Sequence, residues 1–436
     1  MTHKAERNCD VFVAGGGMAG CVAALAARRA GASVILAEAS GMLGGCTTLS
    51  LVQPWQSFHG PPKTEGGQPE QLIRGLAQEI VDDLIMLKGS PGHVLDPIGF
   101  APTLTPVNTA VLAPYLVEKL ISEGVEIYLN RRAESVGTFG DCLKSVTLSW
   151  DMREPFAQIR VRPKAVVDAT GSAAIARLAG EEVIIPRDPQ AWTHIFVLAG
   201  VDIDAVRSYV EKHPEDFHLS SEFKQRLNKY LAVSGYFQLV RDAQGRGEFP
   251  CLRDRLLFFG GARSGEVAVN TTRVFPPKDY FTEQTSSQFQ IAAKLRVDAL
   301  QQVHALASWM KRRVPGFKHS ELTAVAPEIG IRESYRISGK QILKGKDVLQ
   351  GRTFCNPAVT VFYPIDIHLA GSGLKTRELS RPYQIPKGTI VSRRYDNLFA
   401  AGRCLSCDST AFASARVTPI AMALGEAAGK LATACL

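Results

Sequence analysis

The segment 11–38 constrains the fold of this chain more than any other part of its 436 residues. It begins with four apolar residues, 11–14, a composition typical of a buried strand. The glycine motif GGGMAG at 15–20 follows, then an alanine-rich stretch to about Arg29 and a second apolar run at 33–37. This order predicts a strand, a tight turn, a helix and a parallel second strand.

Each part of this segment has a physical role in holding a dinucleotide. Gly15 makes the tight turn, Gly17 lets the backbone approach a pyrophosphate, and Gly20 lets the helix pack closely on the strand. The N–H groups at the helix N-terminus attract phosphate, and Glu38 follows where a carboxylate accepts hydrogen bonds from a ribose. A glycine-rich turn without a ligand explains fewer of these features, so the segment predicts a dinucleotide site.

Composition places the chain among ordinary globular proteins. Hydrophobic residues make up 45% and charged residues 21%, and the length suffices for two packed domains. The first ten residues are polar, and no apolar run approaches membrane-spanning length, so we expect neither a signal peptide nor a membrane partner. Nine scattered cysteines indicate reduced thiols and no metal site. A cytoplasmic protein is expected.

The formal net charge of +8 raises the question of a nucleic-acid partner. The basic residues are spread along the chain, without a Lys/Arg-rich tail or a basic stripe interleaved with aromatics. An anionic cofactor and an anionic small-molecule substrate explain the net positive charge equally well. Nucleic-acid binding is therefore the lesser alternative.

Later segments favour FAD as the dinucleotide. The loop GMLGGCTT at 41–48 offers backbone amides to a pyrophosphate and a ribityl chain. Two further apolar strands, which end in Ala-Thr-Gly at 165–171 and in Ala-Gly-Arg at 397–403, are expected beside the strand–helix–strand segment 11–38. The stretch 416–419 opens a helix over 420–433, with proline in its first turn, whose positive end can face the flavin. A cofactor held by both chain ends is typical of FAD domains.

With these motifs the sequence resembles the FAD-dependent oxidoreductases of the glutathione-reductase-like superfamily, and within it the FAD-oxidoreductase family, many of whose members have no assigned substrate. The resemblance covers nearly the whole chain. It implies an α/β fold, with a Rossmann-like FAD-binding domain built from both chain ends and an inserted α+β substrate domain. Besides the glycine motif, it is carried by 44–45, 72–81, 331–339, 363–368 and 396–429.

The motif positions predict the residues that contact FAD. Cys46 follows a flavin-facing Gly-Gly pair, where a thiol could bond covalently to the flavin; we favour a small residue chosen for close packing. The predicted cofactor residues are Gly15, Gly17, Met18, Ala19, Gly20, Glu38, Ala39, Gly44, Gly45, Cys46, Thr47, Ala133, Ala169, Thr170, Gly171, Gly402, Arg403, Val417 and Thr418.

One departure from the family pattern creates Cys404-x-x-Cys407, where the family usually continues to Ser-Ala-Asp. A redox dithiol there would make the protein a disulfide reductase. Such reductases also need a second dinucleotide site, and the stretch 256–265 has the wrong glycine spacing and precedes a strand. We therefore interpret the pair as two buried cysteines.

These placements predict the domain organisation. The FAD-binding domain consists of 1–52, 106–180 and 386–436, and 181–385 forms the substrate domain. Residues 53–105 contain a Gly/Pro-rich loop near the active site, followed by a helix from Pro69 to Leu87. Within this scheme we expect a helix–strand pair at 108–129, helices near 204–231 and 284–313, and short strands around 256–275 and 357–369.

Four side chains are the candidates for catalysis: His368, Arg332, Arg336 and Arg416. His368 is the best acid or base because imidazole titrates near neutral pH, although a structural histidine bonded to Asp366 is nearly as good an explanation. Arg332 and Arg336 would share one face of a helix and clamp a carboxylate, or they would pair with Glu333 and Glu328. Arg416 would stabilise reduced flavin or contact phosphate or substrate. Tyr363 and His59 are weaker candidates.

We therefore predict an FAD-dependent oxidoreductase, a dehydrogenase or oxidase. It would transfer hydride between flavin N5 and a small polar substrate, which can be anionic. The electron acceptor is not identified by the sequence. The alternatives are reduction of an activated double bond with an arginine as proton donor, an RNA-linked flavoprotein, and a disulfide reductase. A homo-oligomer is compatible with the sequence, which decides neither the oligomeric state nor covalent attachment of FAD.

Overall fold

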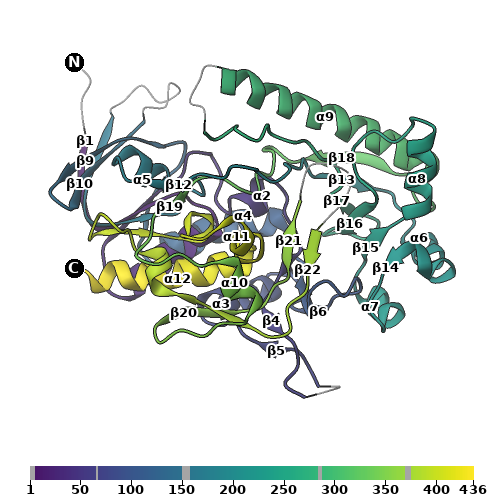
Figure 1. The fold of residues 1–436 in the computed structure, drawn as a ribbon, viewed down its shortest axis with the longest axis horizontal. Coiled ribbons are helices and arrows are strands. Elements are labelled where there is room, and N and C mark those ends of the chain that lie inside the picture. The colour runs from purple at the N-terminus through teal and green to yellow at the C-terminus, as the bar shows by residue number, and fades with distance from the viewer. Residues whose placement is uncertain (1–4, 65–66, 150–157, 283–286, 369–374) are drawn as a thin grey trace.

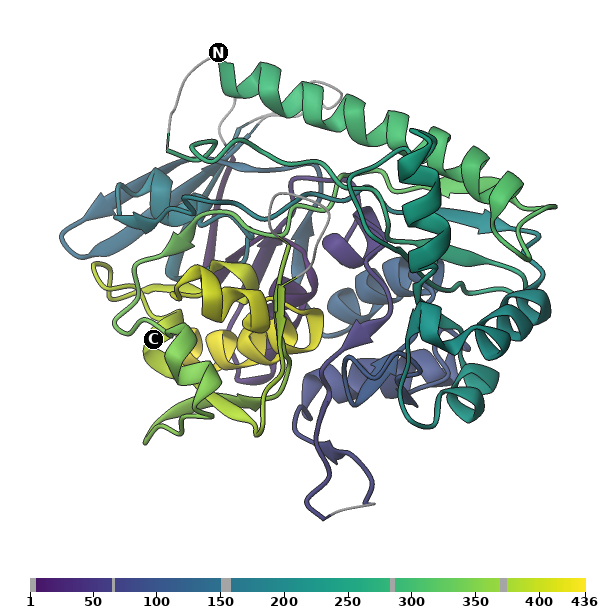
Figure 2. The ribbon, with the colours of Figure 1, turned by 45° about the vertical axis from the view of Figure 1, so that its right-hand side comes forward.

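The computed structural model describes residues 5–64, 67–149, 158–282, 287–368 and 375–436. Two regions lie side by side (Figures 1 and 2). One combines the purple N-terminal and yellow C-terminal parts of the chain, and the other is built mainly from the teal and green middle.

The first region surrounds a seven-stranded sheet of order β8-β2-β1-β11-β10-β9, with β24 beside β11. Five strands run parallel, whereas β9 and β10 form an antiparallel hairpin on β11. The strands are β1 (Ala5–Ala14), β2 (Val34–Ala37), β8 (Glu126–Tyr128), β9 (Ala133–Phe139), β10 (Cys142–Leu148), β11 (Ile159–Asp168) and β24 (Leu398–Ala400).

Strand β1 is buried on both faces, as its apolar run predicts. Val11 and Val13 pack into the core that holds helix α1 (Met18–Arg29), and Phe12 and Ala14 pack into the core on the opposite face. The predicted parallel pairing of the first two strands is confirmed by their register from Val11↔Val34 onward.

The two chain ends meet in this region through helices α1 and α12 (Thr418–Ala434). A Cβ on Gly425 would lie 2.2 Å from the carbonyl oxygen of Ala19, and one on Gly429 would lie 2.2 Å from that of Ala23. Only glycine permits this approach. The predicted α/β fold, with an FAD-type domain closed by the C-terminus, is confirmed.

The second region is a six-stranded antiparallel sheet of order β14-β15-β16-β17-β13-β18. Its strands are β13 (Phe196–Ala199), β14 (Phe217–His218), β15 (Ala232–Gly235), β16 (Leu256–Gly260), β17 (Val267–Val269) and β18 (Glu321–Val325). Its helices are α6 (Ile203–Lys212), η1 (Pro214–Asp216), α7 (Phe223–Lys229), α8 (Phe237–Gly245) and the long α9 (Ser287–Arg313), which lies across the top of Figure 1.

Alternation along these strands gives the second sheet two different faces. Val233 and Phe258 pack beneath the helices, whereas their neighbours Ser234, Leu257 and Phe259 line a cavity on the other side. The sheet therefore forms one wall of that cavity.

The remaining elements lie outside the two main sheets. Near the N-terminal part they are α2 (Cys46–Leu49), β3 (Trp55–Gln56), β4 (His59–Gly60), β5 (Glu70–Gln71), α3 (Leu76–Met86), β6 (Val94–Leu95), β7 (Thr103–Thr105) and α4 (Thr109–Ser122). Later ones are α5 (Ala174–Leu178), β12 (Val183–Ile184), β19 (Arg336–Ile337), α10 (Gly345–Leu349), β20 (Pro357–Val361), β21 (Ile365–Ile367), β22 (Lys375–Arg377), β23 (Tyr383–Pro386), η2 (Lys387–Ile390), η3 (Gly402–Cys404) and α11 (Ser409–Ala415).

Two predicted helices differ from the structure. The helix expected over 69–87 begins only at Leu76, because Glu70–Gln71 pairs as a strand with His59–Gly60. The helical stretch expected near 204–231 is broken after α6, since Pro214 disfavours helical backbone in the residue before it. No helix among the described residues is both long and apolar enough to cross a membrane.

Candidate active site

The first cavity begins at the carboxyl end of β1, where the glycine motif turns into α1. Gly15 has φ +102°, and a Cβ there would lie 2.5 Å from the carbonyl oxygen of Ala169. Gly20 does not line the cavity; a Cβ there would lie 1.8 Å from the carbonyl oxygen of Gly15, so it serves helix–strand packing. At Gly17, which lines the cavity, a Cβ would meet only the Cα of Gly45, at an ordinary contact distance of 3.8 Å. Any side chain at this position would therefore take space at the cavity wall.

Glu38 lies at the rim of the first cavity, directly after β2. Its carboxylate accepts hydrogen bonds from the backbone N–H of Gly16 at 2.6 Å and of Ser40 at 2.8 Å. A carboxylate has about four lone-pair sites, so acceptor capacity remains for the hydroxyls of a ribose.

The second glycine loop lies against the first. The N–H of Gly44 donates to the carbonyl of Gly16 at 2.8 Å, and a Cβ on Gly45 would lie 2.8 Å from the Cα of Gly17. Both glycines of this loop have positive φ, +102° and +55°. The two loops thus expose backbone on one side of the cavity, as a diphosphate requires.

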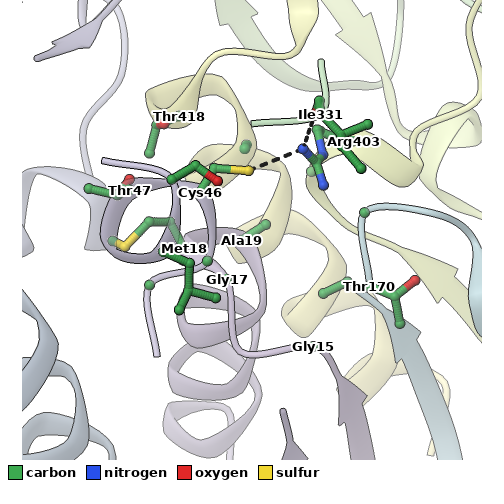
Figure 3. Close-up of a pocket in the computed structure, with 18 of the residues that line it drawn as sticks. Gly15, Gly17, Met18, Ala19, Cys46, Thr47, Thr170, Ile331, Arg403 and Thr418 are labelled. Atoms are coloured by element: carbon green, nitrogen blue, oxygen red, sulfur yellow. Dashed lines mark hydrogen bonds between the residues drawn. The ribbon is translucent and has the colours of Figure 1, made fainter. Parts of the chain in front are cut away.

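The opposite side comes from the ends of β11 and β24 and the start of α12 (Figure 3). Arg403 reaches across the cavity and donates from Nη1 to the carbonyl oxygen of Ile331 at 2.6 Å and to Cys46 Sγ at 3.1 Å. Its guanidinium also approaches Gly171, where a Cβ would lie 2.5 Å from Nη2. Arg403 is therefore a fixed positive charge on this cavity.

The structure brings most of the predicted cofactor residues together around the first cavity. Among the described lining residues are Gly15, Gly17, Met18, Ala19, Glu38, Gly44, Gly45, Cys46, Thr47, Ala169, Thr170, Gly171, Gly402, Arg403 and Thr418. Val417 lines the second cavity instead. Ala39 and Ala133 lie outside both described linings; Ala133 opens β9, where it pairs with Leu148.

A second cavity, of about 370 Å³, adjoins the first and lies between the two regions of the fold. The volume is that of a small-molecule site. Five residues border both cavities: Cys46, Ile331, Arg403, Arg416 and Thr418. A ligand in the first cavity can therefore meet a ligand in the second at this junction.

His368 lines the second cavity and is 5% exposed. Its Nε2 lies 3.0 Å from Oδ2 of Asp366, which also accepts from Arg416 Nη2 at 3.2 Å. Burial, together with the charge of Arg332, lowers the pKa of His368 to about 3. Burial alone would raise the pKa of Asp366, but the hydrogen bond from His368 and the charges of Arg416 and Arg332 hold it well below its usual range. The pair is thus an ionised carboxylate beside a neutral imidazole.

Arg332 lies on the same cavity, close to His368. Its Nη1 donates to the carbonyl oxygen of Ala191 and to Thr193 Oγ1, both at 2.6 Å. Burial and the nearby charges of Arg416 and Arg253 lower its pKa well below the usual value. The described residues include no carboxylate in ion-pair contact with it.

The donor set of the first cavity fits FAD. A helix N-terminus and two glycine loops suit the diphosphate, Glu38 suits a ribose, and Arg403 suits the electron-rich edge of a flavin. A sequence model described as FAD dependent oxidoreductase matches residues 10–436, nearly the whole chain.

The chain belongs to this family of FAD-dependent oxidoreductases. FAD is accordingly its cofactor, and the protein is an enzyme. No curated protein matches the sequence.

Several solved structures are similar to this chain only at low sequence identity. A geranylgeranyl bacteriochlorophyll reductase-like protein from Thermoplasma acidophilum has a TM-score of 0.47 and 12% identity, with 98% of this chain and 78% of that chain covered. The flavin-dependent brominase Bmp2 has a TM-score of 0.47 and 13% identity, with 98% of this chain and 80% of that chain covered. A flavoprotein/dehydrogenase from Cytophaga hutchinsonii has a TM-score of 0.44 and 13% identity, with 98% of this chain and 78% of that chain covered. At these scores the family assignment depends on the sequence match alone.

The structure does not bring Arg336 to either cavity of the flavoenzyme, contrary to the predicted arginine clamp. The segment before it is not helical, and Arg336 begins strand β19. Its guanidinium is buried, pairs with Glu333 at 2.7 Å and donates from Nε to the carbonyl oxygen of Cys407 at 3.0 Å. The predicted alternative, an ion pair with Glu333, is the one that Arg336 makes. Through it and the Cys407 carbonyl, Arg336 links segment 333–336 to the chain near Cys407.

Cys404 and Cys407 are buried free thiols. Cys404 Sγ accepts from the N–H of Gly171 at 3.1 Å and of Ala173 at 3.4 Å, and so supports the turn after β11. Burial raises the pKa of both thiols, that of Cys407 to about 12. A dithiol that exchanges electrons needs an accessible thiolate, so the structure favours the interpretation of two buried cysteines.

Sequence reasoning missed much of the second cavity. Thr193, Arg253, Asn270 and Trp55 line it, although they come from distant segments. Arg255, directly before the apolar strand 256–260, lines the cavity as well. Nothing in the sequence indicates that Glu328 and Ile329 would line the cofactor cavity.

Proposed function

We propose that the enzyme oxidises a small polar substrate in the second cavity, at a C–H bond next to oxygen or nitrogen. When bound, FAD supplies the acceptor for the hydride. His368 accepts the proton that leaves the substrate oxygen or nitrogen, so the substrate loses two electrons and two hydrogens in total. The observation that carries this proposal is the position of His368 in a cavity that shares its junction residues with the cofactor cavity.

The hydrogen bonds around His368 orient the imidazole for this role. Because Asp366 is ionised, the shared hydrogen bond requires the imidazole proton on Nε2, which leaves Nδ1 as the basic nitrogen. Arg416 neutralises Asp366 and keeps the carboxylate in place. Asp366 and Arg416 are thus positioning residues for the imidazole.

The test is anaerobic reduction of the purified protein. We expect a visible flavin spectrum that bleaches with one class among hydroxy acids, polyols and amines. His368→Gln should keep the flavin spectrum and slow bleaching. If none of these compounds bleaches the flavin, the proposed direction of the reaction is wrong.

A second candidate function is reduction of an activated double bond. The lowered pKa of Arg332 favours it, because a buried guanidinium with a lowered pKa can donate a proton to the developing carbanion. In that case flavin reduced with dithionite should reoxidise anaerobically with an unsaturated carboxylic acid, and Arg332→Lys should slow that step.

A further inference from the structure

Among the described residues that line the second cavity there are five arginines and two carboxylates, Asp366 and the exposed Glu378, so positive charge is in excess. Arg255 is paired in a bidentate contact with Asp254, at 2.7 and 2.8 Å, and Arg416 is paired with Asp366. Arg253 and Arg332 also line the cavity, and neither has a described carboxylate within ion-pair distance. A buried cation without an anionic partner is costly, so a ligand that brings anions is favoured here.

Arg253 is the more deeply buried of the two, at 3% exposure. It lies where β16 begins and β17 ends, and its Nη1 donates to the carbonyl oxygen of Asn270 at 2.9 Å. A guanidinium carries five N–H donors, and this is the one hydrogen bond from the Arg253 guanidinium to the described residues. Burial and the charges of Arg273 and Arg255 lower the pKa of Arg253 to about 10.

FAD does not supply the missing anion. Arg253 and Arg332 line the second cavity and not the first, whereas Arg403 borders both. The diphosphate belongs at the glycine loops of the first cavity, and reduced flavin would be neutralised at the junction. The charge at Arg253 therefore remains for the substrate.

Aromatic side chains line the same cavity. Trp55, Phe100 and Phe259 are among them, and the Trp55 Nε1 donor is already satisfied by Thr47 Oγ1 at 3.1 Å. Tyr363 turns its hydroxyl to Gln56 Oε1 at 2.7 Å. Such a lining suits a ligand with a short carbon chain or ring as well as charged ends.

We infer that the substrate is a small organic dianion, with one carboxylate at Arg332 and a second carboxylate at Arg253. The inference rests on the proposed function, which places the substrate in this cavity, and adds its chemical class. Arg332 would hold the end nearest His368, and Arg253 would select for length and for the second charge. Arg253 is then a specificity-determining residue.

The experiment is a binding titration on the oxidised holoenzyme, followed through shifts in the flavin absorbance. The probes are propionate and butyrate, against malonate, succinate and glutarate. We expect one dicarboxylate to bind about tenfold more tightly than the monocarboxylate of equal chain length, as a charge-assisted contact to arginine implies. Equal affinities would overturn the inference. Phosphoglycolate extends the series, and tighter binding than any dicarboxylate would overturn the second carboxylate in favour of a phosphate.

Variants separate ligand binding from a structural role. Arg253→Gln should abolish the advantage of the dicarboxylate and leave monocarboxylate affinity unchanged, and Arg253→Lys should restore part of it. Arg332→Gln should weaken both classes. Arg246→Gln, at an exposed arginine of the same region that pairs with Glu248, is the control and should change neither.

Thermal unfolding provides a second readout. Without ligand, Arg253→Gln should unfold at the same or a higher temperature, because it removes a buried unpaired charge. A clear drop in Tm, with the preference for dicarboxylates retained, would make Arg253 a structural residue and overturn the inference. Because the titration requires bound flavin but no turnover, it can fail while the proposed oxidation stands, and the reverse also holds.

Discussion

The two cavities of this flavoenzyme are built in opposite ways. The first is walled mainly by backbone, at glycine turns that follow parallel strands and precede helices. The second is walled by side chains from segments far apart in the chain, with arginines set among aromatic residues. A cofactor shared by a whole family is held by features of the fold, whereas the substrate is selected by side chains that can vary while the fold stays the same.

The largest expected effect tests the backbone character of the first cavity. In Gly17→Val the new Cβ lies no nearer than 3.8 Å to the protein, and the side chain occupies the space that the diphosphate needs. We expect a folded protein whose affinity for FAD falls by about a hundredfold or more, measured by flavin fluorescence on titration. Gly245→Val is the control, since a Cβ at Gly245 meets no atom within 4 Å. Retained yellow colour in Gly17→Val would contradict the proposed placement of the cofactor.

A smaller effect tests the side-chain character of the second cavity. His368→Gln should lower the rate of anaerobic flavin reduction about 10²- to 10³-fold, because a positioned base contributes roughly that much, while FAD affinity is unchanged. The exposed His304→Gln on α9 is the matched control. An unchanged reduction rate in His368→Gln would leave His368 as a structural partner of Asp366.

The pH profile should show the altered titration of His368. Its pKa is lowered to about 3, so the imidazole stays neutral and able to accept a proton from pH 8 down to pH 5. An imidazole of ordinary pKa would lose about tenfold in activity by pH 5.5. We therefore expect kcat/KM to stay level on the acid side to pH 5. An acid limb near pH 6.5 that disappears in His368→Gln would contradict this.

The same shift predicts the direction in which acid changes stability. The folded protein keeps His368 neutral while the unfolded chain protonates near pH 6.5, so its contribution is complete above pH 6.5 and falls as the pH approaches 3. Chemical unfolding between pH 7 and 4.5 should therefore show a shallower loss of stability in His368→Gln than in the parent. A steeper loss would mean that His368 is charged in the fold.

The smallest expected effect concerns the thiol pair. Cys407→Ala should leave turnover within about twofold, because a buried thiol of raised pKa does not exchange electrons at neutral pH. Cys355→Ala, at an exposed cysteine, is the control. Loss of turnover in Cys407→Ala alone, at unchanged FAD content, would revive a redox role.

How far the sequence predicts each site follows from how that site is built. Gly15, Gly17 and Glu38 act through local geometry, a turn, a helix start and a strand end, so their spacing along the chain carries the information. Arg332 and Arg336 look equivalent in the sequence. The structure turns one toward the second cavity and pairs the other with Glu333 in the core, a choice that depends on β19 pairing with β12.

The sequence by itself thus determined the cofactor, the α/β fold class and the closure of the FAD-type domain by the C-terminal helix. These depend on periodicity, glycine turns and helix ends, which act over a few residues. Only the tertiary structure decided which arginines remain without a carboxylate partner. That depends on the register of β16 with β17 and on the packing of two regions against each other, which bring Arg253 and His368 to one cavity across more than a hundred residues.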